Sequence, residues 1–536
     1  MKGNSGKIFD AQGMSDKQLH AIERDILIVG SGAASVAMAT RLVNAGLKVL
    51  VLEAGDRLVN SDSSPFFEAR DSDPFGLSLQ FGGSTNLWSG RTAPLEDVDM
   101  TQAKGWPFER ASIEAYYEEA LRFLRLQPFE RVAGIPPYDG GQKQWNDFLA
   151  NADISVKRFQ WNRPVFKGLE YFSALAASNA NLTVLLNCRA LKLLLDDTGV
   201  RVVSVRANAG PGRFVELVAP RFALCAGGLE TPRILLNSRA ANRPALDNPN
   251  IGRYFSTHPK SNVGRIHLTQ AVSTKHPLFS DISDKGGEFR FGIGVGGEAF
   301  ERAGRLNHYV QFSPRFESIG LSLLDHAQHV AASVLMRSDQ EGRSLNPLSF
   351  ARRRLQSFTT GLGRILFNVI GKMGLLGKKG TVLVVRGFFD QFPSSDNRIV
   401  LTEETDPYGM PKARVSWTFS SDDRASVHSF LKDLADRIRH HGLGTFEITL
   451  PAADEPWKIT EIHSHLLGTT RMGTSSEYSV TDANGRVHNL ENLFVGGASL
   501  MTSYGYANPV LTIMALAFLT ADKICEQHKM ETGRRA

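Results

Sequence analysis

The stretch that decides the fold is DILIVGSGAASVAMATRLVNAGLKVLVLEAG, residues 25–55. The run 26–29 is short and wholly apolar, which predicts a strand buried on both faces of a sheet. Apolar residues then recur at helical spacing over 33–43, and Gly46 ends that helix. A second strand is expected over 48–52. The stretch therefore predicts a strand–helix–strand unit of a Rossmann-like α/β domain.

The turn between the first strand and the helix has the pattern G-x-G-x-x-S. Gly30 suits the tight turn, and Gly32 lets the backbone approach a pyrophosphate. Ser35 is small enough for helix–strand packing, and the helix N-terminus at Ala33 favours an anion. Glu53 ends the next strand, where a carboxylate accepts hydrogen bonds from an adenosine ribose and repels a 2′-phosphate. The pattern predicts NAD or FAD rather than NADP, with a glycine-rich turn of an unrelated α/β protein as the alternative.

Composition narrows the class of protein. A chain of 536 residues favours two domains, and a net charge of +6 is too mild to indicate a nucleic-acid partner. The three cysteines form neither a disulfide framework nor a metal motif, which favours a reducing compartment. The polar first residues lack the apolar core of a signal peptide, and no long apolar run is present, so we expect a cytoplasmic protein.

The chain is expected to form two domains of different type. We assign 21–257 and 455–530 to a discontinuous Rossmann-like domain, with inserted segments near 105–180. Alternating, strand-like segments dominate 258–454, which predicts a β-sheet-rich α+β substrate-binding domain. Hairpin turns are expected at 196–199 and 406–409.

Three later segments resemble the glucose–methanol–choline (GMC) family of FAD-dependent alcohol oxidoreductases. They are GGSTNLWSGR (82–91), CAGGLETPRILLNS (225–238) and NLENLFVGGASLMTSYGYANPVLTIMALA (489–517). NIGRYFSTHP (250–259) also looks familial. The resemblance covers about 24–100, 215–258 and 455–527, and it implies FAD as the cofactor. Another FAD enzyme with a sterol-type substrate and a non-catalytic FAD-binding protein stay open as alternatives.

The resemblance also implies the cofactor contacts. In the family the loop matching 82–91 lies along the flavin, and a histidine there attaches FAD covalently in some sugar-oxidising members. This loop has no histidine, so noncovalent FAD is expected. Gly497 departs from the family, which usually has aspartate there. The expected contacts beyond the first turn are Gly82, Gly83, Ser84, Asn86, Leu87, Trp88, Ala190, Ala226, Gly227, Gly497, Ala498, Asn508, Pro509 and Val510.

The segment HSHLLGTTRMG, 463–473, resembles the catalytic-histidine segment of the family. Only His465 has the family's spacing to the Gly-Thr pair, so His465 is expected to be the base and His463 to be structural. An imidazole suits proton abstraction because its pKa lies near neutral pH. A metal site at the two histidines is the alternative, but no further ligand is identifiable.

Asn508 and Pro509 precede the last apolar segment. Asn508 is expected either to cap the helix, with Pro509 at its first position, or to hydrogen-bond the substrate oxygen as the resemblance implies. The backbone at Val510, in the first turn, would then stabilise charge on the reduced flavin.

The segment 352–379 predicts a basic amphipathic helix with no acidic residue. Two interpretations of this helix stay open. It packs on the second domain with its basic face in solvent, or it docks on a membrane surface or a partner. The segments GGSTNLWSGR (82–91) and RMG (471–473) resemble the saccharide- and polyol-oxidising branch of the family, which implies a hydroxyl of a sugar, glycoside, polyol or aminocyclitol-like molecule as the substrate. They do not indicate the electron acceptor.

Overall fold

The computed structural model describes residues 7–57, 66, 78–129, 135, 143–239, 244–273, 276–284, 287–296, 306–315, 379–457, 461–462 and 465–533. His463 lies outside these residues. The predicted basic helix over 352–379 also lies outside them, apart from its last residue. That residue, Lys379, begins a strand, so the helix does not extend as far as predicted.

A parallel sheet forms the centre of the Rossmann-like half of the molecule, and it confirms the predicted fold class. In the described residues it has six strands in the order β1, β5, β3, β2, β9, β19. Every residue of β2 and β3 is buried, which explains their wholly apolar sequences. The strands are β1 (Lys7–Asp10), β5 (Leu182–Leu186), β3 (Val49–Leu52), β2 (Ile26–Val29), β9 (Phe222–Leu224) and β19 (Leu493–Val495).

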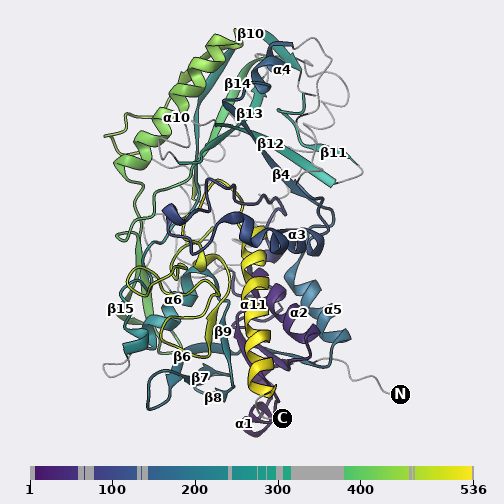
Figure 1. Cartoon of the computed structure of the whole chain (residues 1–536), viewed down its shortest axis with the longest axis vertical. Helices are drawn as coiled ribbons and strands as arrows, with labels where there is room; N and C mark the ends of the chain where they lie inside the picture. The colour runs from purple at the N-terminus through teal and green to yellow at the C-terminus, as the bar shows by residue number, and fades with distance from the viewer. Residues whose placement is uncertain are drawn as a thin grey trace, which may run out of the picture.

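Helices cover this sheet, and α11 is the longest of those described. α11 (Val510–Gly533) lies beside α2 (Ala33–Asn44), with α3 (Glu114–Phe123) packed against it (Figure 1). All residues from 514 to 521 are buried, so this part of α11 is enclosed on every side. Within the described residues, this half also contains α1 (Asp16–His20), α5 (Gly168–Ser178) and α6 (Gly227–Asn237).

A second, antiparallel sheet lies at the opposite end of the long axis (Figure 1). Its central order is β11, β12, β13, β14, β10, β17, with β4 paired to β12 and β18 paired to β10. The strands are β11 (Ile282–Asp284), β12 (Gly287–Val295), β13 (Tyr309–Arg315), β14 (Lys379–Phe388), β10 (Pro259–Ser273), β17 (Gly444–Ile448), β4 (Ile154–Trp161) and β18 (Glu461–Ile462).

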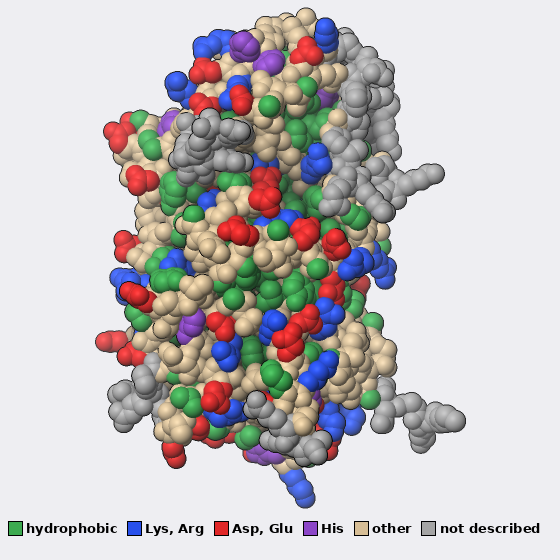
Figure 2. All heavy atoms as spheres, viewed as in Figure 1, with side chains coloured by type: hydrophobic (Ala, Val, Ile, Leu, Met, Phe, Trp, Pro, Cys, Tyr) green, Lys and Arg blue, Asp and Glu red, His purple; other side chains and the backbone are tan. Residues whose placement is uncertain are grey.

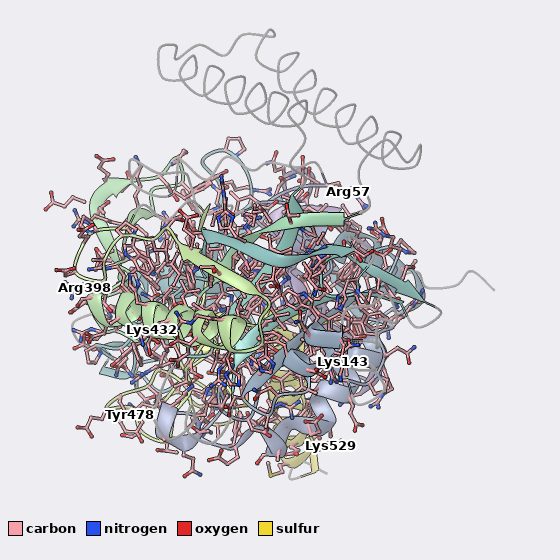
Figure 3. The ribbon with its side chains drawn as sticks, turned by 90° about the horizontal axis from the view of Figure 1, so that it is seen from above. Arg57, Lys143, Arg398, Lys432, Tyr478 and Lys529 are labelled. Atoms are coloured by element: carbon pink, nitrogen blue, oxygen red, sulfur yellow. The ribbon has the colours of Figure 1, made fainter. Side chains whose placement is uncertain are left out.

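The helix α10 (Ser421–His440) covers this antiparallel sheet. It starts with a capping box between Ser420 and Asp423, and it buries a stripe that includes Val427, Leu431 and Ile438. Lys432 lies on the outside of the helix (Figure 3), where its side chain is 78% exposed. The short helix α4 (Lys143–Leu149) packs near β4.

Two small sheets confirm the predicted hairpins. β6 (Arg189–Leu195) pairs with β7 (Val202–Asn208), which pairs in turn with β8 (Phe214–Val218). β15 (Arg398–Thr405) pairs with β16 (Pro411–Ser416). The hairpins turn where the sequence predicted, at 196–199 and 406–409.

Three strands cross the predicted domain limits. β4 lies in the predicted inserted segments near 105–180 and pairs along its whole length with β12 of the antiparallel sheet. β18 was expected in the first domain but pairs with β10 of the antiparallel sheet. β1 extends the parallel sheet on the N-terminal side of residue 21 by pairing with β5. Sequence position does not reveal these pairings, because each joins segments more than a hundred residues apart.

Surface features of the described residues are ordinary. Basic and acidic side chains are interspersed on the face shown in Figure 2. All three cysteines are buried and unpaired. Among the described residues, each helix is either too short or too polar to span a lipid bilayer.

The start of α11 corrects one expectation. The helix begins at Val510, and the carbonyl of Pro509 accepts the hydrogen bond of the Ile513 N–H, so Asn508 lies before the cap position. The capping hydroxyl instead comes from Thr92, whose Oγ1 accepts from the Leu511 N–H at 3.2 Å. The same hydroxyl donates to the Asn508 carbonyl oxygen at 3.2 Å. A distant residue has therefore taken the role predicted for Asn508.

Replacing Thr92 by valine should lower the free energy of unfolding by about 1 kcal/mol, the usual cost of a lost cap. Thr520→Val is the matched control in the same helix, because the buried Thr520 hydroxyl has no hydrogen-bond partner among the described residues. That change should be neutral or stabilising. Denaturant midpoints of the two variants measure the difference. Equal midpoints would contradict the assigned cap.

Candidate cofactor and active site

Loops from several strand ends meet at the carboxyl edge of the parallel sheet. Gly30 follows β2 with φ +95°, and a Cβ there would lie 2.7 Å from the Cys225 carbonyl oxygen, so only glycine fits. A Cβ on Gly83 would lie 3.3 Å from the Gly32 Cα, which shows that the 82–91 loop touches the first turn. Gly497 approaches the same helix start, because its Cβ would lie 3.2 Å from Ala34 Cβ.

One hydroxyl ties three of these segments together. Ser31 Oγ donates to the Glu53 carboxyl and accepts from the Gly82 N–H at 2.8 Å. The other Glu53 oxygen accepts from the Gly55 N–H at 2.8 Å. Burial raises the pKa of Glu53 to about 7, although these hydrogen bonds and the Arg189 charge lower it. Additional hydrogen-bond donors at the end of β3 would therefore stabilise the ionised form of the Glu53 carboxyl.

The helix start beside Ser31 has the features of an anion site. A Cβ on Gly32 would meet no atom within 4 Å, so space is open there. Gly32 provides no side-chain cap for α2, and its first N–H groups therefore carry the positive end of the helix dipole. Ser35 Oγ is buried without a hydrogen-bond partner among the described residues. These observations fit a dinucleotide pyrophosphate at Gly32, Ala33 and Ser35.

Hydrogen bonds to the neighbouring segments 81 and 166–169 hold the 82–91 loop in place. The Asn86 side chain donates to the Phe81 carbonyl at 2.7 Å and accepts from the Leu169 N–H at 3.2 Å. The Trp88 indole N–H donates to the Phe166 carbonyl at 2.7 Å, and the ring packs against the main core. Ser84 is exposed, and Leu87 is 55% exposed. Asn86 and Trp88 therefore hold the loop in place.

The other predicted cofactor residues lie on two further segments. Ala190 stands on β6, two residues after Cys188, whose N–H donates to the Glu53 carbonyl at 2.9 Å. Ala226 and Gly227 start α6 directly after β9. Gly497 precedes a 3-10 turn that begins at Ala498. All these segments follow strands of the same sheet or border Glu53, as a shared nucleotide site requires.

The His465 segment is held by an irregularity in α6. α6 begins at Gly227, and Pro232 lies in its second turn. Proline cannot donate to the carbonyl four residues back, which belongs to Gly228. Thr469 Oγ1 donates to that carbonyl at 2.8 Å instead. The missing helix bond thus anchors the chain four residues after His465.

His465 faces a second histidine that the sequence analysis did not assign. Ser256 and Leu467 form an antiparallel bridge between the two chain segments. Two residues along each segment, His258 Nδ1 lies 2.8 Å from His465 Nδ1, with the rings nearly perpendicular. His258 is 3% exposed, and burial lowers its pKa to about 4. His258 is therefore a neutral imidazole at neutral pH.

Asn508 lies on the segment that the second histidine also contacts. His258 Nε2 is 3.3 Å from the Tyr504 carbonyl oxygen. Asn508 Nδ2 donates to the Arg91 carbonyl at 3.0 Å, at the end of the 82–91 loop. The predicted catalytic residues are thus joined through His258 and the segment 504–508.

Several residues of the site carried no sequence signal for their role. His258 stands in NIGRYFSTHP, a segment that resembled the family, but nothing in that pattern indicated a contact with His465. Ser31 occupies a variable position of the glycine motif. Thr92 reaches Asn508 across more than four hundred residues of sequence. Only the folded chain shows these three contacts.

Comparison with known proteins decides the family. Two models, each described as GMC oxidoreductase, match residues 170–260 and 393–517. A model described as an NAD(P)-binding Rossmann-like domain matches residues 28–81. The chain belongs to the GMC oxidoreductase family. As a member of this family it is an FAD-dependent oxidoreductase, which confirms the predicted cofactor and enzyme class.

Curated relatives of this GMC oxidoreductase match over nearly the whole chain. Paromamine 6′-oxidase from Streptomyces fradiae is 23% identical, over 93% of this chain and 91% of the relative. The fructose dehydrogenase large subunit from Gluconobacter japonicus is 29% identical, over 96% of this chain and 100% of the relative. A solved formate oxidase from Aspergillus oryzae has a TM-score of 0.56 at 14% identity, over 95% of this chain and 99% of that one, which shows a shared fold.

The raised pKa of Glu53 predicts a pH-dependent affinity for FAD. If Glu53 holds the adenosine ribose as the sequence predicts, the ribose hydroxyls would donate to the ionised carboxylate, and the complex would bind the Glu53 proton less tightly than the apoprotein does. Affinity should therefore rise with pH, by at most about tenfold per unit, until the pH exceeds the apoprotein pKa of Glu53. Titration of the apoprotein with FAD at several pH values, followed by flavin fluorescence, measures the slope. Glu53→Gln should bind more weakly and lose this slope; an unchanged slope would contradict the role of Glu53.

Proposed function

We propose that this GMC oxidoreductase oxidises a hydroxyl group of a sugar, glycoside, polyol or aminocyclitol-like substrate, with noncovalently bound FAD. The relatives named for paromamine and fructose support this substrate class, since both names refer to hydroxyl-rich molecules. The absence of histidine from the 82–91 loop supports noncovalent attachment.

The observation that carries this proposal is the contact of the partly buried His465 with the buried His258, where the chain passes between the two sheets. With FAD bound, the flavin would supply the hydride acceptor, at N5. His465 would take the proton of the substrate hydroxyl as the alcohol becomes a carbonyl product. His465 acts as the base because an imidazole held in one orientation accepts a proton near neutral pH.

Asn508 would position the substrate oxygen. Its Nδ2 donates to Arg91, which fixes the amide plane. We infer that its remaining amide atoms orient the substrate hydroxyl, a positioning effect. The first N–H groups of α11, near Val510, would favour negative charge on the reduced cofactor, because they carry the positive end of the helix dipole.

The proposal is tested by offering the purified, FAD-loaded protein a panel of sugars, aminocyclitols, polyols and sterols without oxygen. We expect the flavin to bleach with at least one polyhydroxylated compound. Bleaching by sterols alone would favour the alternative substrate class, and a loaded protein that no compound bleaches would favour a non-catalytic role.

His465→Asn should retain FAD and lose about 10²–10⁴-fold in turnover, the usual contribution of a positioned base. The flavin absorbance of the purified variant reports cofactor retention, and stopped-flow bleaching reports turnover. Turnover near that of the unmodified enzyme would exclude His465 as the base.

Asn508→Ala should reduce turnover by more than its loss of stability explains. Its side chain does not cap α11, so the loss of one hydrogen bond to Arg91 should lower the free energy of unfolding by about 1 kcal/mol. Thr92→Val, which removes the actual cap at a similar cost of about 1 kcal/mol but keeps the Asn508 amide, is the matched control and should lose less turnover. If Asn508→Ala loses stability and keeps its turnover, the residue is structural.

A further inference from the structure

We propose that His258 is a positioning residue that sets the tautomer of His465, so that His465 carries its proton on Nδ1 and presents an unprotonated Nε2 to the substrate hydroxyl. The part about the substrate rests on the proposed function. The part about the tautomer rests only on the geometry of the two rings.

The two histidines are brought together by backbone pairing. The Leu467 N–H donates to the Ser256 carbonyl at 3.0 Å, and the Ser256 N–H donates to the Leu467 carbonyl at 3.2 Å. In this antiparallel register, residues 258 and 465 are opposite each other, with side chains on one face. The contact between the rings is thus imposed by the crossing of two chain segments.

Counting protons leaves one arrangement for the pair. A carbonyl oxygen can only accept, so His258 Nε2 must carry the proton that it shares with the Tyr504 carbonyl. His258 is neutral because it is buried, and its Nδ1 is therefore a lone-pair acceptor. The nitrogen facing it at 2.8 Å, His465 Nδ1, must then be the donor.

The Tyr504 carbonyl at the end of this chain is itself held firmly. Tyr504 is 1% exposed, and its hydroxyl donates to the Tyr254 carbonyl at 2.6 Å. A Cβ on Gly468 would lie 2.9 Å from that hydroxyl, so the His465 segment packs against the same ring. The carbonyl that orients His258 and the backbone that carries His465 are therefore fixed relative to each other.

A neutral His465 with its proton on Nδ1 has its basic lone pair on Nε2. The opposite tautomer would turn two lone pairs toward each other across the 2.8 Å contact. When His465 accepts the substrate proton on Nε2, its Nδ1–H bond to His258 persists and stabilises the imidazolium. His258 thereby both sets the direction of proton transfer and supports the charge that forms.

The tautomers can be observed directly by two-bond ¹H–¹⁵N NMR of the FAD-loaded enzyme labelled with ¹⁵N-histidine. Spectra of His258→Gln and His465→Gln identify the two signals among the 14 histidines. We expect His258 as the Nε2–H tautomer and His465 as the Nδ1–H tautomer. An Nε2–H tautomer at His465 would overturn the proposal. This result is independent of turnover, so it can stand if the proposed function fails.

Kinetics of paired variants test the consequence for catalysis. His258→Leu removes both hydrogen bonds and should lower kcat by about 10–100-fold, part of what a positioned base contributes, without raising KM. His258→Asn keeps an acceptor for His465 and a donor for the Tyr504 carbonyl. Its kcat should therefore stay within a few-fold of that of the unmodified enzyme. His276→Leu, at a buried histidine whose ring contacts Trp145 and Phe279 of the second core, controls for the loss of a buried ring and should leave kcat per bound FAD unchanged.

Two outcomes of the kinetics would overturn the role of His258. One is an unchanged kcat in a folded, FAD-loaded His258→Leu variant. The other is an Asn variant that folds, binds FAD and loses as much kcat as the Leu variant. If His258→Leu fails to fold, the Asn variant and the tautomer spectra still decide the matter.

Discussion

The backbone bridge between Ser256 and Leu467 is the constraint on which the active-site geometry depends. The chain leaves the parallel-sheet half just before β10 and returns to it after β18, and these two crossing segments run antiparallel to each other. Their pairing places His258 opposite His465. The same crossing brings Thr469 to α6, where Pro232 has left a carbonyl without its helix partner. A local defect in one helix is therefore satisfied by the segment that carries the proposed base.

At the predicted cofactor site, single buried hydroxyl groups also join several segments of the chain. Ser31 connects the glycine-rich turn, Glu53 and the 82–91 loop through one hydroxyl. Thr92 connects the end of that loop region with α11 by capping the helix and holding the Asn508 carbonyl. Hydrogen bonds of this kind matter because an unpaired buried donor or acceptor costs about 1–3 kcal/mol. They hold loops from distant parts of the chain together at the carboxyl edge of the parallel sheet.

The first strand–helix–strand unit was predictable because its pattern is local. Buried strands are apolar throughout, helices repeat at 3.6 residues, and Gly30 has a backbone geometry that other residues avoid. The hairpin turns were predictable for the same reason. The family resemblance added His465 and Asn508 by matching separated motifs in order.

Other features were not predictable because they depend on pairings across the fold. Asparagine and proline before an apolar segment predict a helix cap from the asparagine side chain. In the structure, the Thr92 hydroxyl from another segment caps the helix instead. Strand β4 could not be assigned to its sheet before its partner β12 was known. His258 looked like any histidine in a familial segment. Its role follows only from its facing nitrogen and from the carbonyl on its other side.

The central claim is that a carbon–hydrogen bond of the substrate alcohol breaks while His465 takes the hydroxyl proton. The most direct measurement is the rate of anaerobic flavin bleaching by an active substrate with and without deuterium on the carbinol carbon. The account predicts that deuterium slows the bleaching several-fold in the unmodified enzyme. Equal rates for the two substrates, under conditions where the reduction step itself is observed, would contradict it.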